Sequence, residues 1–150
     1  MLKLKDIMTR DVLTVTSDTT LRDALQLLSE RHVGGAPVVD RGRIVGVFSS
    51  TDILAFLADL NDPTSSLAFR PRRRRTAPLE DVTVDEVMTR KVEALRPECS
   101  VDEAAVLMVK KQIHRVLVTE GDSLLGIVTT SDVARAVAEH RVGSRTYVFG

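Results

Sequence analysis

The side chains best suited to binding chemistry lie at two points where an apolar strand is followed by a helix. One point reads Ser-Ser-Thr-Asp at 49–52, and the other reads Thr-Thr-Ser-Asp at 129–132. Hydroxyls and the free N–H groups of a helix start can bind phosphate, and a carboxylate can accept hydrogen bonds from ribose hydroxyls. The same residue types cap ordinary helices. Each junction therefore fits either a nucleotide site or a plain cap, and its recurrence favours the binding role.

The two junctions belong to an internal repeat. The segment IMTR at 7–10 returns as VMTR at 87–90, a shift of 80 positions from Met8 to Met88. The same shift continues without a gap and pairs Val12 with Val92, Ala24 with Ala104, Val38 with Val118, Gly46 with Gly126 and Asp52 with Asp132. Self-similarity over such a length indicates two copies of one folding unit. We assign copy one to 6–60, a linker rich in proline and arginine to 61–82, copy two to 83–140 and a tail to 141–150.

Each copy is predicted to contain a strand, a helix, two strands and a second helix. Apolar residues at helical spacing begin at Leu21 and again at Val101, directly after residues that can cap a helix. Glycine and acidic residues then separate pairs of apolar stretches, as in β-hairpins. The predicted strands cover 12–15, 36–40 and 44–49 in copy one, and 92–95, 116–119 and 124–129 in copy two. The fold class is α/β, or α+β, with the order β-α-β-β-α repeated twice.

The copies are expected to need each other. A unit this small buries too little apolar surface to be comfortably stable alone. The strands IVGVF at 44–48 and LLGIV at 124–128 are apolar almost throughout, which is typical of sheets covered on both faces. We therefore expect the two copies to pack through their sheets with pseudo-two-fold symmetry. Clefts at such an interface could hold a small ligand.

Composition excludes several classes of protein. The 21 basic side chains balance the 21 acidic ones, aromatic residues make up only 3%, and Cys99 is the only cysteine. We therefore expect no binder of nucleic acid or membrane through surplus positive charge, no aromatic platform for single strands, and no disulfide or cysteine-rich zinc site. No stretch has the roughly 18 apolar residues of a membrane helix, and no secretory signal is visible. These observations predict a soluble, cytoplasmic protein.

Arrangements typical of catalysis or metal binding are not evident. His32, His114 and His140 lack the spacing of metal ligands. The serines occupy cap positions without a nucleophile elbow, and Cys99 is interpreted as an inert thiol. The chain is therefore predicted to have no catalytic residue and no metal site, and to be no enzyme.

The linker carries the sequence RPRRRR, from Arg70 to Arg75. Runs of charge are usually solvated, so we interpret this run as part of a solvated connection. Its five arginines could also release counterions from a phosphate backbone, which keeps association with nucleic acid as an alternative function. No basic helix face or recognition motif accompanies the run.

In the order and repetition of its motifs, the chain resembles a stand-alone tandem pair of CBS domains, the cystathionine β-synthase type of repeat. The matching segments are Met8–Arg10 and Met88–Arg90, GGAPVVD at 34–40, IHRVLV at 113–118, and the two junctions that end in Asp52 and Asp132. The resemblance covers nearly the whole chain except the linker and the last ten or so residues. No single motif is decisive, and the match rests on all of them together.

This resemblance implies a regulatory protein that binds an adenosyl ligand (AMP, ADP, ATP or S-adenosylmethionine) in two composite clefts, with no required cofactor. The first cleft would combine Thr129 and Asp132 with Thr14, Val33, Gly34 and Gly35. The second would combine Ser49 and Asp52 with the segment Val92 to Ala94 and with Ile113, His114 and Arg115. His114 and Arg115 match phosphate-contacting positions, and Arg115 is preferred because its charge is permanent.

Two positions depart from the family pattern. Ala94 stands where a hydroxyl residue is common, and Gly34-Gly35 replaces a possible donor side chain, so one cleft is expected to bind weakly or stay empty.

Helices at the ends of the copies are expected to form a homodimer across a two-fold axis, and an effector protein would receive the signal. The alternative is a structural dimerisation module whose clefts are vestigial.

Overall fold

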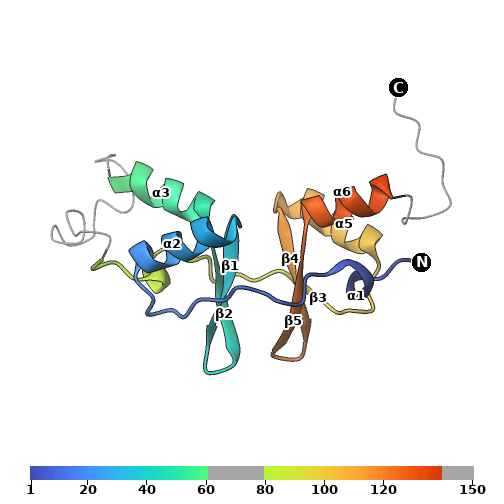
Figure 1. Cartoon of the computed structure of the whole chain (residues 1–150), viewed down its shortest axis with the longest axis horizontal. Coiled ribbons are helices and arrows are strands. Elements are labelled where there is room, and N and C mark those ends of the chain that lie inside the picture. The colour runs from blue at the N-terminus through green and yellow to red at the C-terminus, as the bar shows by residue number, and fades with distance from the viewer. Residues whose placement is uncertain (61–79, 140–150) are drawn as a thin grey trace. The chain divides into compact units, whose positions relative to one another are not determined.

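The computed structural model describes residues 1–60 and 80–139. The chain forms two compact units, which are described one at a time (Figure 1). We name the units by their position along the chain: the inner unit is Leu13–Val92, and the outer unit combines Met1–Val12 with the described residues from Glu93 onward. The Arg70–Arg75 run, His140 and the predicted tail at 141–150 lie outside the described residues. No helix in the described part is long and apolar enough to cross a membrane.

The inner unit is built on one hairpin and two helices. Strands β1 (Gly35–Asp40) and β2 (Arg43–Ser49) pair antiparallel, with Gly35 opposite Ser49. The turn uses left-handed backbone at Arg41 and Gly42, which explains the glycine. Helix α2 (Leu21–Arg31) precedes the hairpin, α3 (Ser50–Leu60) follows it, and a short 3-10 helix, η2 (Val84–Glu86), completes the unit.

The outer unit has the same plan with one more paired strand. Strands β4 (Arg115–Glu120) and β5 (Ser123–Thr129) form its hairpin, and β3 (Ala94–Leu95) lies parallel to β4. Its helices are α1 (Leu4–Ile7), α5 (Val101–Lys111) and α6 (Thr130–Ala138). The mixed α/β class with two repeated units is therefore confirmed. The cap predicted directly before Val101 is also present and forms a capping box, because Ser100 and Glu103 each accept a backbone N–H of the other.

The first predicted strand of copy one is wrong. Residues 12–15 reduce to a single parallel bridge between Val15 and Val38. The chain turns directly afterwards, where the Thr19 N–H donates to the Thr16 carbonyl at 3.2 Å. The Ser17 N–H donates to Asp40 Oδ1 at 2.9 Å, and the hydrogen bonds from Ser17 lower the pKa of Asp40. In copy two, the predicted strand at 92–95 shortens to Ala94–Leu95.

Each unit is completed by a segment from the other sequence copy. We call residues 3–10 the first strap and residues 83–90 the second strap. The first strap binds the outer unit, where Thr9 and Ile127 exchange backbone hydrogen bonds of 2.9 and 3.0 Å. The second strap binds the inner unit, where Thr89 and Val47 exchange bonds of 2.9 and 2.8 Å. The two compact units are therefore not the two contiguous copies of the sequence.

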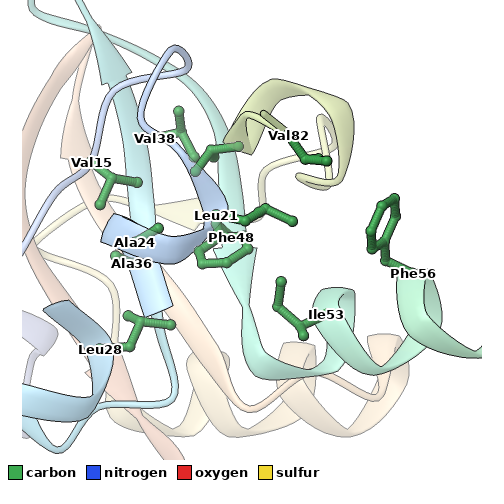
Figure 2. Packing of buried hydrophobic residues seen from close by; sticks show 11 residues of the cluster. Val15, Leu21, Ala24, Leu28, Ala36, Val38, Phe48, Ile53, Phe56 and Val82 are labelled. Atoms are coloured by element: carbon green, nitrogen blue, oxygen red, sulfur yellow. The ribbon is translucent and has the colours of Figure 1, made fainter. Parts of the chain in front are cut away.

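Both cores are aliphatic and include strap residues. In the inner unit, Leu21, Ala24 and Ala36 gather around Phe48, which is fully buried (Figure 2). Val82, directly before the second strap, and Val84, within it, belong to the same cluster. The outer core is formed by Leu4 of the first strap together with Val101, Ala104, Met108, Val116, Val118, Val128 and Ala136. The straps are thus part of the packing that stabilises each unit.

Candidate functional site

The junction of the inner unit brings four predicted site residues together. Gly35 is the sheet partner of Ser49, and the Ser50 N–H donates to the Gly34 carbonyl at 2.9 Å. Asp52 folds back to the strand end, where its Oδ2 accepts the Ser49 N–H at 2.9 Å and the Ser49 hydroxyl at 3.2 Å. The glycines, the hydroxyl and the carboxylate are therefore neighbours at the start of α3.

The junction of the outer unit has the same geometry. Arg115 is the sheet partner of Thr129, and the Thr130 N–H donates to the His114 carbonyl at 3.0 Å. Asp132 Oδ2 accepts the Thr129 N–H at 2.8 Å and the Thr129 hydroxyl at 3.0 Å. Thr129 also accepts the Asp132 N–H, which makes a full capping box. The cap role that the sequence left open is therefore present.

The second oxygen of each carboxylate meets a different partner. In the inner unit, the Thr89 hydroxyl donates to Asp52 Oδ1 at 2.9 Å. In the outer unit, Arg135 Nη1 lies 3.4 Å from Asp132 Oδ1, and the Arg135 side chain is 65% exposed. A carboxylate has about four lone-pair sites, so each Asp keeps acceptor capacity beyond its cap. The positive end of the helix dipole adds a favourable field for an anion at both places.

The remaining predicted residues lie along the same elements. Thr14 precedes the bridge residue Val15, and Val33 follows α2 with its N–H bound to the Leu28 carbonyl at 3.1 Å. Val92 is the last residue of the inner unit, and Ala94 pairs with Leu117 in β3. Ile113 packs against the outer core. The prediction assigns Gly35 and Ser49 to different clefts, and it does the same for Arg115 and Thr129. In the structure, the two residues of each pair are sheet partners within one unit.

Thr89 and Arg135 touch the two carboxylates and were not predicted. Thr89 lies in the repeated MTR motif, but a contact over 37 positions leaves no local pattern. Arg135 lies three residues after Asp132 on α6, so helical spacing could have indicated it. Within residues 1–60 and 80–139, no group of three His, Cys, Asp or Glu side chains is arranged to hold a metal ion.

Comparison with known proteins identifies the repeat. The CBS domain family matches residues 4–59 and 84–139. The CBS domain-containing protein YhcV of Bacillus subtilis is 31% identical over 89% of this chain and 84% of its own length. The CBS domain pair of protein MJ0100, solved with 5′-methylthioadenosine and S-adenosylmethionine, has a TM-score of 0.76 and 27% identity, and the match covers 93% of this chain and 98% of that one. CBSX2, solved with AMP, has a TM-score of 0.76 and 28% identity over 94% and 99%.

Proposed function

We propose that this chain, which belongs to the CBS domain family as a tandem pair, is a regulatory module that binds an adenosyl ligand. The observation that carries the proposal is the repeated junction, in which a hydroxyl and a carboxylate meet at the start of a helix in each unit. AMP, 5′-methylthioadenosine and S-adenosylmethionine occupy the similar solved structures. The ligand of this chain is accordingly AMP, ADP, ATP or S-adenosylmethionine.

The chemistry of the junctions suits the two polar parts of such a ligand. Oδ2 of each carboxylate serves the cap, so Oδ1 of Asp52 and of Asp132 is the oxygen available to a ribose hydroxyl. The N-termini of α3 and α6, with 11 and nine residues, provide the positive dipole end for a phosphate. The same protein groups thus cap the helix and orient the ligand.

Arg115 is proposed to supply a cation for a phosphate. It stands directly opposite Thr129 in the β4–β5 hairpin, and directly opposite residues project to the same face of a sheet. Its neighbour Val116 is fully buried on the other face. The equivalent positions of the inner unit, Gly34 and Gly35, carry no donor side chain. Phosphate recognition is therefore proposed to depend on the single His114-Arg115 pair, with Arg115 as the permanent charge.

Signalling would follow from differential affinity. A ligand that binds one conformation more tightly shifts the population toward that conformation. This requires no covalent chemistry, so we propose regulation rather than catalysis.

A thermal denaturation series tests the proposed function. At a concentration of 100 Kd, a ligand stabilises the folded state by about 2.7 kcal/mol, which corresponds to a rise in Tm of roughly 5–10 °C for a chain of this size. We expect such a rise with at least one of AMP, ADP, ATP and S-adenosylmethionine. Inorganic phosphate is the control, and an equal rise with phosphate alone would contradict recognition of the adenosyl group.

A homodimer is proposed on the basis of two exposed apolar helix faces. Leu54 on α3 is 66% exposed and Val109 on α5 is 79% exposed. The equivalent residues in the other copy, 80 positions away, are Ala134 and Ser29, so the shared fold does not require large apolar side chains there. The last turn of α3 carries Asp59 and no basic residue, whereas α5 ends with Lys110 and Lys111, so the ends of these two helices carry opposite charges.

Substitution of either face should therefore weaken the dimer. Leu54→Glu and Val109→Glu each place a charge in an apolar contact, and we expect dimerisation to weaken by at least ~10-fold. The matched control is Ser29→Glu, the same new side chain at the equivalent position of the other copy. Light scattering after size-exclusion chromatography provides the mass. A monomeric wild-type chain at micromolar concentration, or equal masses for all three variants, would refute this dimer.

A further inference from the structure

The second strap reaches the carboxylate of the inner junction. Thr89 belongs to the MTR motif of copy two, yet its hydroxyl donates to Oδ1 of Asp52 in copy one at 2.9 Å. Both backbone groups of Thr89 are hydrogen-bonded to Val47 of β2: its N–H donates to the Val47 carbonyl at 2.9 Å, and its carbonyl accepts the Val47 N–H at 2.8 Å. The hydroxyl is therefore presented to the carboxylate from a firmly held segment.

The strap has little freedom to move away from this position. Its beginning is anchored in the core by Val84 and by Val82, the residue directly before the strap, with exposed fractions of 0% and 2%. Gly46 lets the strap approach the sheet, because a Cβ at that position would lie 2.8 Å from the Thr89 carbonyl oxygen. A shift of the strap would break these contacts together with the Thr89–Asp52 hydrogen bond.

The first strap, in the outer unit, shows the equivalent arrangement without this bond. Thr9 makes the equivalent backbone bridge to Ile127, and Gly126 allows the equivalent close approach. In the part of the chain that the structure describes, however, the Thr9 hydroxyl donates no hydrogen bond to Asp132. Oδ1 of Asp132 instead faces Arg135, whose counterpart on α3 is Ala55. One carboxylate is thus oriented by the strap and the other by its own helix.

We propose that Thr89 is a positioning residue for the ligand site of the inner unit and that it couples the second strap to occupancy of that site. Ser49 holds Oδ2 of Asp52, and the Thr89 hydroxyl on Oδ1 adds a second point that opposes rotation of the carboxylate about its Cβ–Cγ bond. Thr89 uses one acceptor direction of Oδ1 and leaves the other for a ribose hydroxyl. This inference rests on the proposed function, because it concerns the same carboxylate.

Coupling follows from the shared oxygen atom. A ligand that is bound more tightly when Thr89 holds Asp52 must, by thermodynamic linkage, stabilise the bond between Thr89 and Asp52 by the same factor. The strap continues through Val92 into the outer unit, so the stabilised segment is one of the two that connect the units along the chain, the other being the step from Val12 to Leu13. Ligand binding at Asp52 would therefore also stabilise this connecting segment.

The test compares Thr89→Val with the matched control Thr9→Val. Both replace a strap threonine that keeps its backbone bridge, but only the first removes a hydrogen bond to a carboxylate. The probes are AMP, ADP, ATP and S-adenosylmethionine, titrated by calorimetry. We expect Thr89→Val to weaken binding of the probe by about 10-fold, the effect of one hydrogen bond to a charged group. Thr9→Val should stay within about twofold, and Thr89→Ser, which keeps the hydroxyl, should restore the affinity.

Hydrogen exchange provides a readout that a purely structural role would not move. Saturating probe should slow exchange of the Thr89 and Val47 amides in the wild-type chain, and this protection should be lost in Thr89→Val. If both valine variants bind the probe as the wild type does, the positioning role is overturned while the proposed function stands. If none of the four probes binds the wild-type chain, the failure lies in the proposed function, and the positioning role falls with it.

Discussion

A chain that carries both Asp52→Asn and Asp132→Asn is expected to bind its adenosyl ligand roughly 10- to 100-fold more weakly than the wild type. The hydrogen bond from a ribose hydroxyl to a carboxylate is worth about 1.5–3 kcal/mol, which corresponds to roughly 10- to 100-fold in affinity. Asparagine keeps one acceptor oxygen, which can continue to serve the cap at Ser49 or Thr129. Its amide group would present N–H donors to hydroxyl donors, so the ribose loses its acceptor.

The single variants assign the sites. Asp52→Asn should remove binding at the inner unit only, and Asp132→Asn at the outer unit only. Asp102→Asn, on the exposed first turn of α5, is the matched control and should bind as the wild type does. All variants should keep a ligand-free stability within about 2 kcal/mol of the wild type, the upper range for loss of a helix cap. Unchanged affinity in the folded double variant would show that these carboxylates do not contact the ligand.

Gly46→Ala and Gly126→Ala are each expected to destabilise one unit by about 1–3 kcal/mol, the usual cost of overpacking. A Cβ at either glycine would lie 2.8 Å from the strap carbonyl, that of Thr89 or of Thr9. The backbone must then move, because a carbonyl oxygen is not the flexible end of a side chain. The two backbone hydrogen bonds between strap and sheet would lengthen or break, and strap residues would leave the core.

Urea denaturation with amide exchange measures this effect. Exchange should accelerate at Val47 and Thr89 in Gly46→Ala and at Thr9 and Ile127 in Gly126→Ala. Gly121→Asn is the control, because a Cβ at Gly121 meets no atom within 4 Å and asparagine tolerates its positive φ. A free energy of unfolding that stays within about 0.5 kcal/mol of the wild type in both alanine variants would mean that the straps do not need the close approach.

Much of this architecture was readable from the sequence because its causes are local. Apolar spacing after Thr20 and Ser100 predicted α2 and α5, and both caps are present. The constant shift between Asp52 and Asp132 located both junctions, since each capping geometry involves residues only three positions apart. The strand predicted at 12–15 failed because β propensity counts apolar residues and not pairing partners, and only Val15 finds a partner.

The exchange of straps could not be predicted, because a repeat shows which residues are equivalent and not which copy they pack against. Met8 and Met88 match perfectly in sequence, yet Met8 lies against Gly126 of the other copy and Met88 against Gly46. The hydrogen bond between Thr89 and Asp52 depends on that exchange. The composite clefts, which combine residues from the inner and outer units, stay a prediction.

Calorimetric titration of the wild-type chain with AMP, ADP, ATP and S-adenosylmethionine tests the central claim most directly. The account predicts saturable binding of at least one of these ligands, with one or two molecules per chain, and loss of that binding in the Asp52→Asn, Asp132→Asn double variant. Absence of binding for all four ligands to the folded chain would contradict it, and would leave a structural dimerisation module as the function.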